Sequence, residues 1–102
     1  MALINDALDY LQITWQDDAL QRKLEGAMAR GEALIDEYAG TPQDYNIPGT
    51  AQGLLFDYLR YVRSDATEMF EQNYQRDLLR LRRNAMADIA IAAAIEEAGV
   101  NA

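Results

Sequence analysis

Hydrophobic residues recur at three- and four-residue steps along most of this chain, most densely between Leu54 and Arg83. This spacing places apolar side chains on one stripe of an α-helix. One stripe comprises Leu54, Leu55, Tyr58, Leu59 and Val62, and a second comprises Ala66, Met69, Phe70, Tyr74, Leu78 and Leu81. The stretch also holds five of the nine aromatic and six of the nine basic residues. We therefore expect the rest of the chain to pack against it.

Ser64 and Asp65 separate the two stripes. A short side chain that carries oxygen can cap a helix by accepting a hydrogen bond from a free backbone N–H, and Glu68 follows at capping-box distance. The pattern favours two helices that meet here, with one bent helix as the alternative.

The first amphipathic segment spans residues 3–13, with Asn5 or Asp6 as its cap. It is only two or three turns long, so packing must stabilise it. Trp15 lies just beyond, where the pattern breaks. We interpret this tryptophan as a plug over the edge of the core, with an exposed docking anchor as the alternative.

A long helix of about 23 residues is expected between Asp17 and Gly40. The carboxylates of Asp17 and Asp18 suit the positive end of the helix dipole. Gly40 suits a left-handed helix end, and Pro42 cannot continue the helix. No further acids follow Asp17 and Asp18 at ligand spacing, so no metal site is expected. Within this segment, Gly26 and Gly31 indicate either close approach of another helix or subunit, or tolerated flexibility.

Residues 41–49 contain both prolines of the chain and form its one substantial loop. Tyr45 and Ile47 are apolar enough to fold back onto the domain, which we favour, or to meet a neighbouring molecule. Thr50 is expected to cap the helix that follows.

Residues 85–102 are rich in alanine, the best helix former. We expect this C-terminal helix to reach about Ala98, to end at Gly99 and to leave a frayed tail. Its larger apolar residues do not keep to one stripe, so its own core or a partner must cover them, and partner contact is favoured. These residues are Met86, Ile89, Ile91 and Ile95.

Composition narrows the function. The chain has 102 residues, no cysteine, no histidine and a net charge of −8. The missing histidine removes the commonest general base and metal ligand, so we expect no enzyme, no cofactor and no metal site. The acidic balance disfavours binding that neutralises DNA phosphates. No apolar run spans a bilayer and no basic leader is present, so a soluble, unexported protein is expected.

The sharpest electrostatic feature is a basic cluster on the last helix, formed by Arg76, Arg80, Arg82 and Arg83. Arg76, Arg80 and Arg83 share one helix face, with Asp77 and Asp88 nearby. One interpretation is contact with an acidic protein partner or intermittent contact with a DNA backbone. The other is a solvated face with weak local ion pairs.

Two segments carry a resemblance to a known family. Residues 35–41 (IDEYAGT) end the long helix at a tyrosine and a glycine, and residues 51–61 (AQGLLFDYLRY) open an aromatic helix that precedes a polar Arg-Ser-Asp break. With a short helix before them and a proline-bearing loop between them, they resemble the head-tail connector (adaptor) proteins of long-tailed bacteriophages. The similarity is to the small all-helical members and covers nearly the whole chain.

This resemblance implies a structural virion protein, made in the host cytoplasm and located at the head-tail junction. Such connectors form a ring, usually of twelve subunits, below the portal protein, and they offer a surface to the next neck or tail-completion protein. DNA passes through the ring without specific binding, no membrane is involved, and no catalytic residues carry over. An acidic lining lets a polyanion slide without adhering. The loop at residues 41–49 has no strand pattern, so a docking hairpin is not expected here.

We therefore predict an all-α fold in which residues 1–102 form one small antiparallel bundle of about four helices with one proline-bearing loop. The candidate interface residues are Trp15, Arg76, Arg80, Arg82, Arg83, Met86, Ile89, Ile91 and Ile95. The alternative function is a small helical regulator that binds nucleic acid through residues 76–83.

Overall fold

The computed structural model describes residues 2–15 and 17–100, and the side-chain environments of residues 3–15 and 17–97. Its elements are α1 (Ala2–Tyr10), α2 (Asp18–Ala39), α3 (Thr50–Arg63), a short 3-10 helix η1 (Thr67–Met69) and α4 (Phe70–Val100). The described part of the chain contains no strand, so the predicted all-α fold is confirmed.

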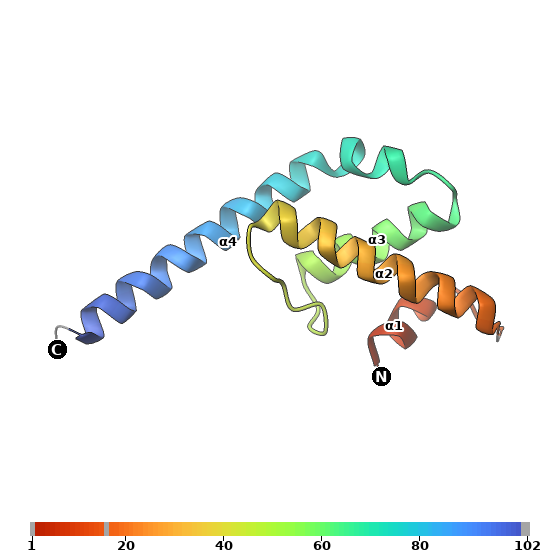
Figure 1. Ribbon diagram of the computed structural model, residues 1–102, viewed down its shortest axis with the longest axis horizontal. Helices are drawn as coiled ribbons and strands as arrows, with labels where there is room; N and C mark the ends of the chain where they lie inside the picture. Colours follow the sequence, from red (N-terminus) through yellow and green to blue (C-terminus); the bar gives the residue numbers. More distant parts are fainter. Residues whose placement is uncertain (1, 16, 101–102) are drawn as a thin grey trace.

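Successive long helices reverse direction, so α2 and α4 run the same way with α3 between them in the chain (Figure 1). Helix α2 packs against both α3 and α4, whereas α1 contacts α3. The largest fully buried side chains come from all three long helices and face a single core. They are Leu24, Ile35, Leu55, Leu59, Phe70 and Leu78.

Both ends of α2 follow the sequence prediction. Asp17 is the N-cap, and its side chain accepts a hydrogen bond of 3.0 Å from the Leu20 backbone N–H. Gly40 ends the helix in the left-handed region at φ 81°, and its N–H bonds to the Asp36 carbonyl. The helix has 22 residues, close to the expected 23.

Three predicted caps are wrong. Helix α1 begins at Ala2, so Asn5 and Asp6 lie inside it. Gly49, not Thr50, occupies the N-cap position of α3, without a side-chain cap bond. Asp65 does not cap the next helix, because it adopts φ 56° and closes α3: the following N–H, of Ala66, bonds back to the Tyr61 carbonyl.

The break at Ser64 and Asp65 was placed correctly, and two helices meet there. The other boundaries differ slightly. Helix α1 ends at Tyr10, where Gln12 turns the chain at φ 60°. Helix α4 continues through Gly99 to Val100, and the last two residues of the predicted frayed tail lie outside the described part.

Gly31 lets α3 approach α2 closely. A Cβ built on Gly31 would lie 2.8 Å from Leu55 Cδ1 and 2.8 Å from Tyr58 Cδ2, whereas one on Gly26 would meet only Arg30 Nη1 at 3.6 Å. The close approach of another helix is therefore confirmed at Gly31, whereas no other helix in the described part of the chain approaches Gly26.

Substituting these two glycines should change stability in opposite directions. Gly31→Ala overpacks the interface of α2 with α3 and should destabilise the protein by about 1–3 kcal/mol. Gly26→Ala should stabilise it by up to about 1 kcal/mol through helix propensity alone. Urea unfolding followed by circular dichroism measures both. Equal effects of the two changes would contradict the close approach.

The proline-bearing loop is held by one tyrosine. Tyr45 is buried, and its hydroxyl donates to Asp36 Oδ1 at 2.6 Å and approaches the Glu32 carbonyl at 3.2 Å. Asp36 Oδ1 also accepts from the Gln43 backbone N–H at 3.0 Å. Ile47 remains 58% exposed, so only the tyrosine folds back as expected.

Tyr45→Phe should cost about 1–2 kcal/mol of stability at neutral pH, because the Asp36 carboxylate loses a buried donor. Burial, with the hydrogen bond to Asp36, raises the pKa of Tyr45 above its ordinary value of 10.0. The folded state therefore favours the protonated phenol of Tyr45. The stability that this phenol contributes is fully present below about pH 10 and is lost as the pH rises further. Unfolding measured from pH 7 to 11 should show that the stability of the variant falls less steeply at alkaline pH than that of the native chain. An unchanged decline would contradict this role.

Candidate functional site

Helix α4 is divided into a packed half and a projecting half. The first half is anchored in the core by Phe70, Leu78, Leu81 and Ala85, which are all buried. Every described side chain from residue 86 to residue 97 is exposed. We call residues 86–97 the arm. At 1.5 Å per residue the arm is about 18 Å long.

The arm leaves the body of the molecule and ends at its far tip (Figure 1). The principal extents are 57 × 30 × 17 Å and the radius of gyration is 16.2 Å. A compact domain of about 100 residues has a radius of gyration of about 13 Å. The molecule is therefore more extended than a compact domain, because the end of α4 projects beyond the packed helices.

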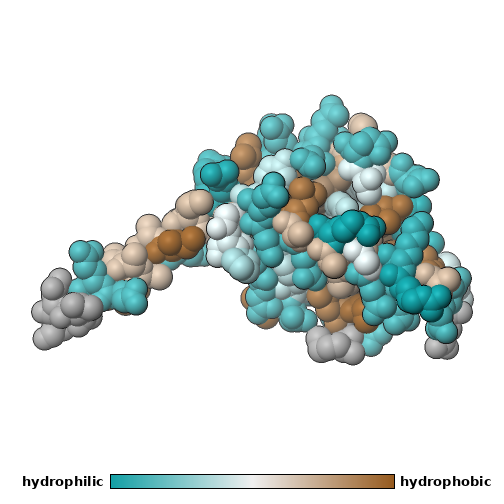
Figure 2. Space-filling model, viewed as in Figure 1, coloured by the Kyte–Doolittle hydropathy of each residue, from teal (hydrophilic) through white to brown (hydrophobic). Residues whose placement is uncertain are grey.

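The surface of the arm is largely apolar (Figure 2). Its large hydrophobic side chains are all substantially exposed, and Ile95 is the most exposed of them at 68%. Ile89 and Ile91 lie about 200° apart around the helix, so no single packing face of this chain can cover both. These side chains include all four apolar candidates from the sequence, Met86, Ile89, Ile91 and Ile95.

The root of the arm lies beside the loop after α2. A Cβ built on Gly40 would lie 3.0 Å from Met86 Cε, so this methionine touches the end of α2. A shallow hollow separates residues 41–43 from α4 at Asp88 and Ala92. The body thus supports the arm only along its first turns.

A second exposed surface lies on α4 before the arm. Leu79 is 47% exposed, and with Arg76, Arg82, Arg83 and Gln75 it lines a shallow hollow. We call Arg76, Leu79, Arg82 and Arg83 the arginine surface. It points away from the core because Leu78 and Leu81 on the same helix face inward.

The predicted grouping of arginines changes in the structure. Arg80 is exposed but does not line this hollow, whereas Arg82 joins Arg76 and Arg83 there. Leu79 was missed by the sequence analysis. Its signal was an apolar residue next to Leu78 but out of phase with the core stripe.

None of these arginines is neutralised by a close acid in the part of the chain that the structure describes. The ion pair found there joins Arg60 to Asp57 at 3.7 Å. The expected local pairs of the arginine cluster with Asp77 and Asp88 are absent from the described residues. The arginine surface therefore presents its positive charge to solvent.

A cluster of rings and polar side chains fixes the direction of α4. The Phe70 ring stacks on Tyr74 at a centroid distance of 4.9 Å and meets Tyr61 edge-on at 5.8 Å. Arg60 Nη2 donates to the Tyr74 hydroxyl at 3.0 Å, and burial raises the pKa of Tyr74. This phenol therefore stays protonated at neutral pH and acts as a structural hydrogen-bonding group.

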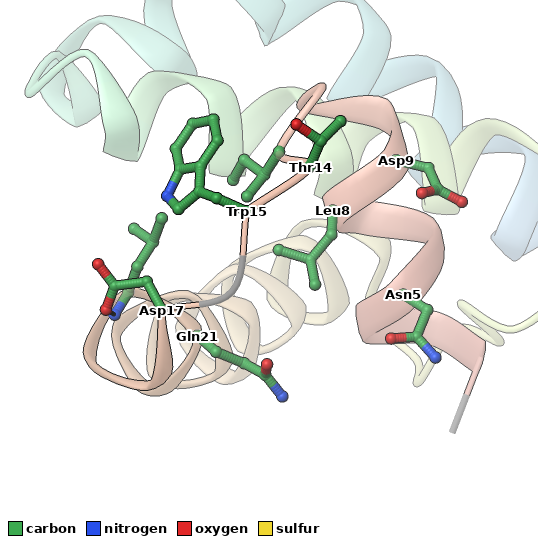
Figure 3. Close-up of a pocket in the computed structure, with 9 residues that line it drawn as sticks. Asn5, Leu8, Asp9, Thr14, Trp15, Asp17 and Gln21 are labelled. Atoms are coloured by element: carbon green, nitrogen blue, oxygen red, sulfur yellow. Dashed lines mark hydrogen bonds between the residues drawn. The ribbon is translucent and has the colours of Figure 1, made fainter.

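The other sequence candidate, Trp15, lies in the connection between α1 and α2. Trp15 is 54% exposed, so the predicted plug is wrong. The Arg63 guanidinium carbon lies 5.9 Å from the ring centroid, within cation–π range. Trp15 also borders a hollow with Leu8 of α1 and Asp17 at the start of α2 (Figure 3). None of the residues that line this hollow belongs to the arginine surface or the arm.

Neither a metal centre nor a membrane span is found in the described residues. No group of three or more acidic, histidine or cysteine side chains there could hold an ion. None of the described helices is long and apolar enough to cross a bilayer.

No family model, curated protein or solved structure matches this chain.

Proposed function

We propose that this protein is a structural assembly subunit, and specifically a head-tail connector (adaptor) of a bacteriophage virion. The observation that carries the proposal is the arm, whose four large apolar side chains are 44–68% exposed. Exposed apolar surface of this kind marks a site of protein–protein contact. A helix that projects from its own domain can cross to another subunit.

The proposed partners are copies of the same chain in a ring, with twelve as the expected number in the virion. The portal protein lies above the ring, and a neck or tail-completion protein lies below it. The net charge of −8 supports a conduit through which DNA passes without specific binding. A closed ring joins two different faces of each subunit, and the arm and the body of this chain are two such faces.

Electron microscopy of the purified protein mixed with its cognate portal tests this role. Ring-shaped complexes on the portal are expected for the native chain. A variant with Ile89→Gln, Ile91→Gln and Ile95→Gln should lose them, because it removes the apolar surface while glutamine preserves the helix. Circular dichroism of that variant checks that the helix remains. A native protein that stays apart from the portal at high concentration would refute the connector assignment.

One observation favours a second candidate, a nucleic-acid-binding regulator. The arginine surface has no close acidic partner in the described chain, as a phosphate-binding face requires. Affinity for duplex DNA should then fall by about 0.9 log units per log unit of salt for each phosphate contacted. Fluorescence anisotropy at low salt measures this, and the absence of binding there would dismiss the regulator.

A further inference from the structure

Charge is segregated along α4 in a way that the connector proposal does not use. Residues 76–83 contain four arginines against Asp77 and carry a net charge of +3. Residues 84–102 contain no lysine or arginine, and three acids give this segment a net charge of −3. The acids are Asp88, Glu96 and Glu97, all exposed on the arm.

These opposite charges form no ion pair within one copy in the part of the chain that the structure describes. Arg83 and Glu96 are 13 residues apart on one continuous helix, which separates them by about 20 Å along its axis. Exposed charges at that distance are largely screened at about 0.1 M salt, where the Debye length is about 10 Å. A rigid helix therefore displays two complementary surfaces that only a second molecule can bring together.

The shapes of the two surfaces are also compatible. Five alanines between Ala87 and Ala94 keep most of the arm narrow, so another helix can approach its backbone closely. The arginine surface offers the half-exposed Leu79 as an apolar floor between long, flexible arginine side chains. The arginine stems can cover apolar surface while their guanidinium groups reach carboxylates.

We infer that the arm of one copy of this chain lies along the arginine surface of a second copy. Asp88 and Glu96, which lie about 80° apart around the arm, then face Arg76, Arg82 and Arg83 of the other copy, and alanines of the arm cover Leu79. The inference rests on the proposed function as an assembly subunit and names the two surfaces that join its copies. Each copy either passes its arm to the next copy, which builds a ring, or exchanges arms with one partner.

Charge reversal on each surface tests the contact. The arm variant carries Asp88→Lys and Glu96→Lys, and the surface variant carries Arg76→Glu, Arg82→Glu and Arg83→Glu. Sedimentation velocity at about 50 mM salt should show association of the native chain, weakened about 10- to 100-fold in either variant alone. Mixed in equal amounts, the two variants should associate again, because each arm then meets a surface of opposite charge.

A matched control separates this contact from an effect of net charge. Arg22→Glu, Lys23→Glu and Arg30→Glu reverse three exposed cations on α2, with the same change in total charge as the surface variant. The control should associate like the native chain. Circular dichroism of every variant should show unchanged helicity.

A native chain that stays monomeric, reversals without effect, or a mixture that does not recover would each overturn the inference. The connector proposal is judged separately by rings on the portal. Native rings that are insensitive to both reversals would leave the connector proposal in place and remove this contact. Recovery in the mixture without any binding to the portal would support the contact and refute the connector.

Discussion

Phe70→Ala is expected to lower the free energy of unfolding by about 3–5 kcal/mol. Phe70 is the first residue of α4, and its side chain is fully buried. It meets Tyr58 and Tyr61 edge-on at centroid distances of 5.2 and 5.8 Å and stacks on Tyr74 at 4.9 Å. The substitution removes a large apolar side chain and three aromatic pairs, each worth about 0.5–1.5 kcal/mol beyond its buried area.

The measurement is urea unfolding at a protein concentration where the chain is monomeric. Phe70→Leu keeps much of the volume and should cost only about 1–2 kcal/mol, so a graded loss identifies packing as the cause. Met69→Ala changes the neighbouring, exposed side chain and should have an effect within about 0.5 kcal/mol. A loss at Phe70 no larger than that at Met69 would contradict this ring cluster as the anchor of α4.

Leu78→Ala and Leu79→Ala should affect the stability of the monomer very differently, although the two leucines are adjacent. Leu78 is fully buried and Leu79 is half exposed, because one residue rotates a helix position by about 100°. Leu78→Ala should cost about 2–5 kcal/mol of stability. Leu79→Ala should change the stability of the monomer by no more than about 0.5 kcal/mol.

Unfolding measurements test the stability half of this prediction, and sedimentation tests the other half. If copies join through the arginine surface, Leu79→Ala should weaken self-association while leaving the monomer folded. The reverse ranking of the two leucines in unfolding would mean that α4 is rotated about its axis relative to the described structure. Such a result would also remove the basis for the arginine surface.

Much of the fold could be predicted from local properties of the sequence. Hydrophobic spacing predicted the helices, and the glycine and proline at residues 40–42 marked the end of α2 because their backbone preferences act within a few residues. The break at Ser64 and Asp65 followed from the change of stripe. The structure of this break was predicted wrongly, because Asp65, a non-glycine residue at φ 56°, ends α3 where an N-cap of the next helix was expected.

The candidate site was only partly predictable. The arginines and the isoleucines stood out by composition, but Leu79 did not, because helical spacing does not say which stripe the body will cover. The exposure of Trp15 was misjudged for another reason. This residue lies in the α1–α2 connection, and the position of that connection beside Arg63 decides how much of the side chain is covered.

The sequence by itself determined that this chain is helical, acidic and apolar along its last segment, since these properties follow from local composition and spacing. Only the tertiary structure decided that the core closes at Ala85 and that residues 86–97 project beyond it. The physical reason is that α2 ends at Gly40 and the following loop supports α4 only near the root of the arm. Whether a residue of α4 is buried depends on how far the neighbouring helices extend beside it, and tertiary packing sets that distance.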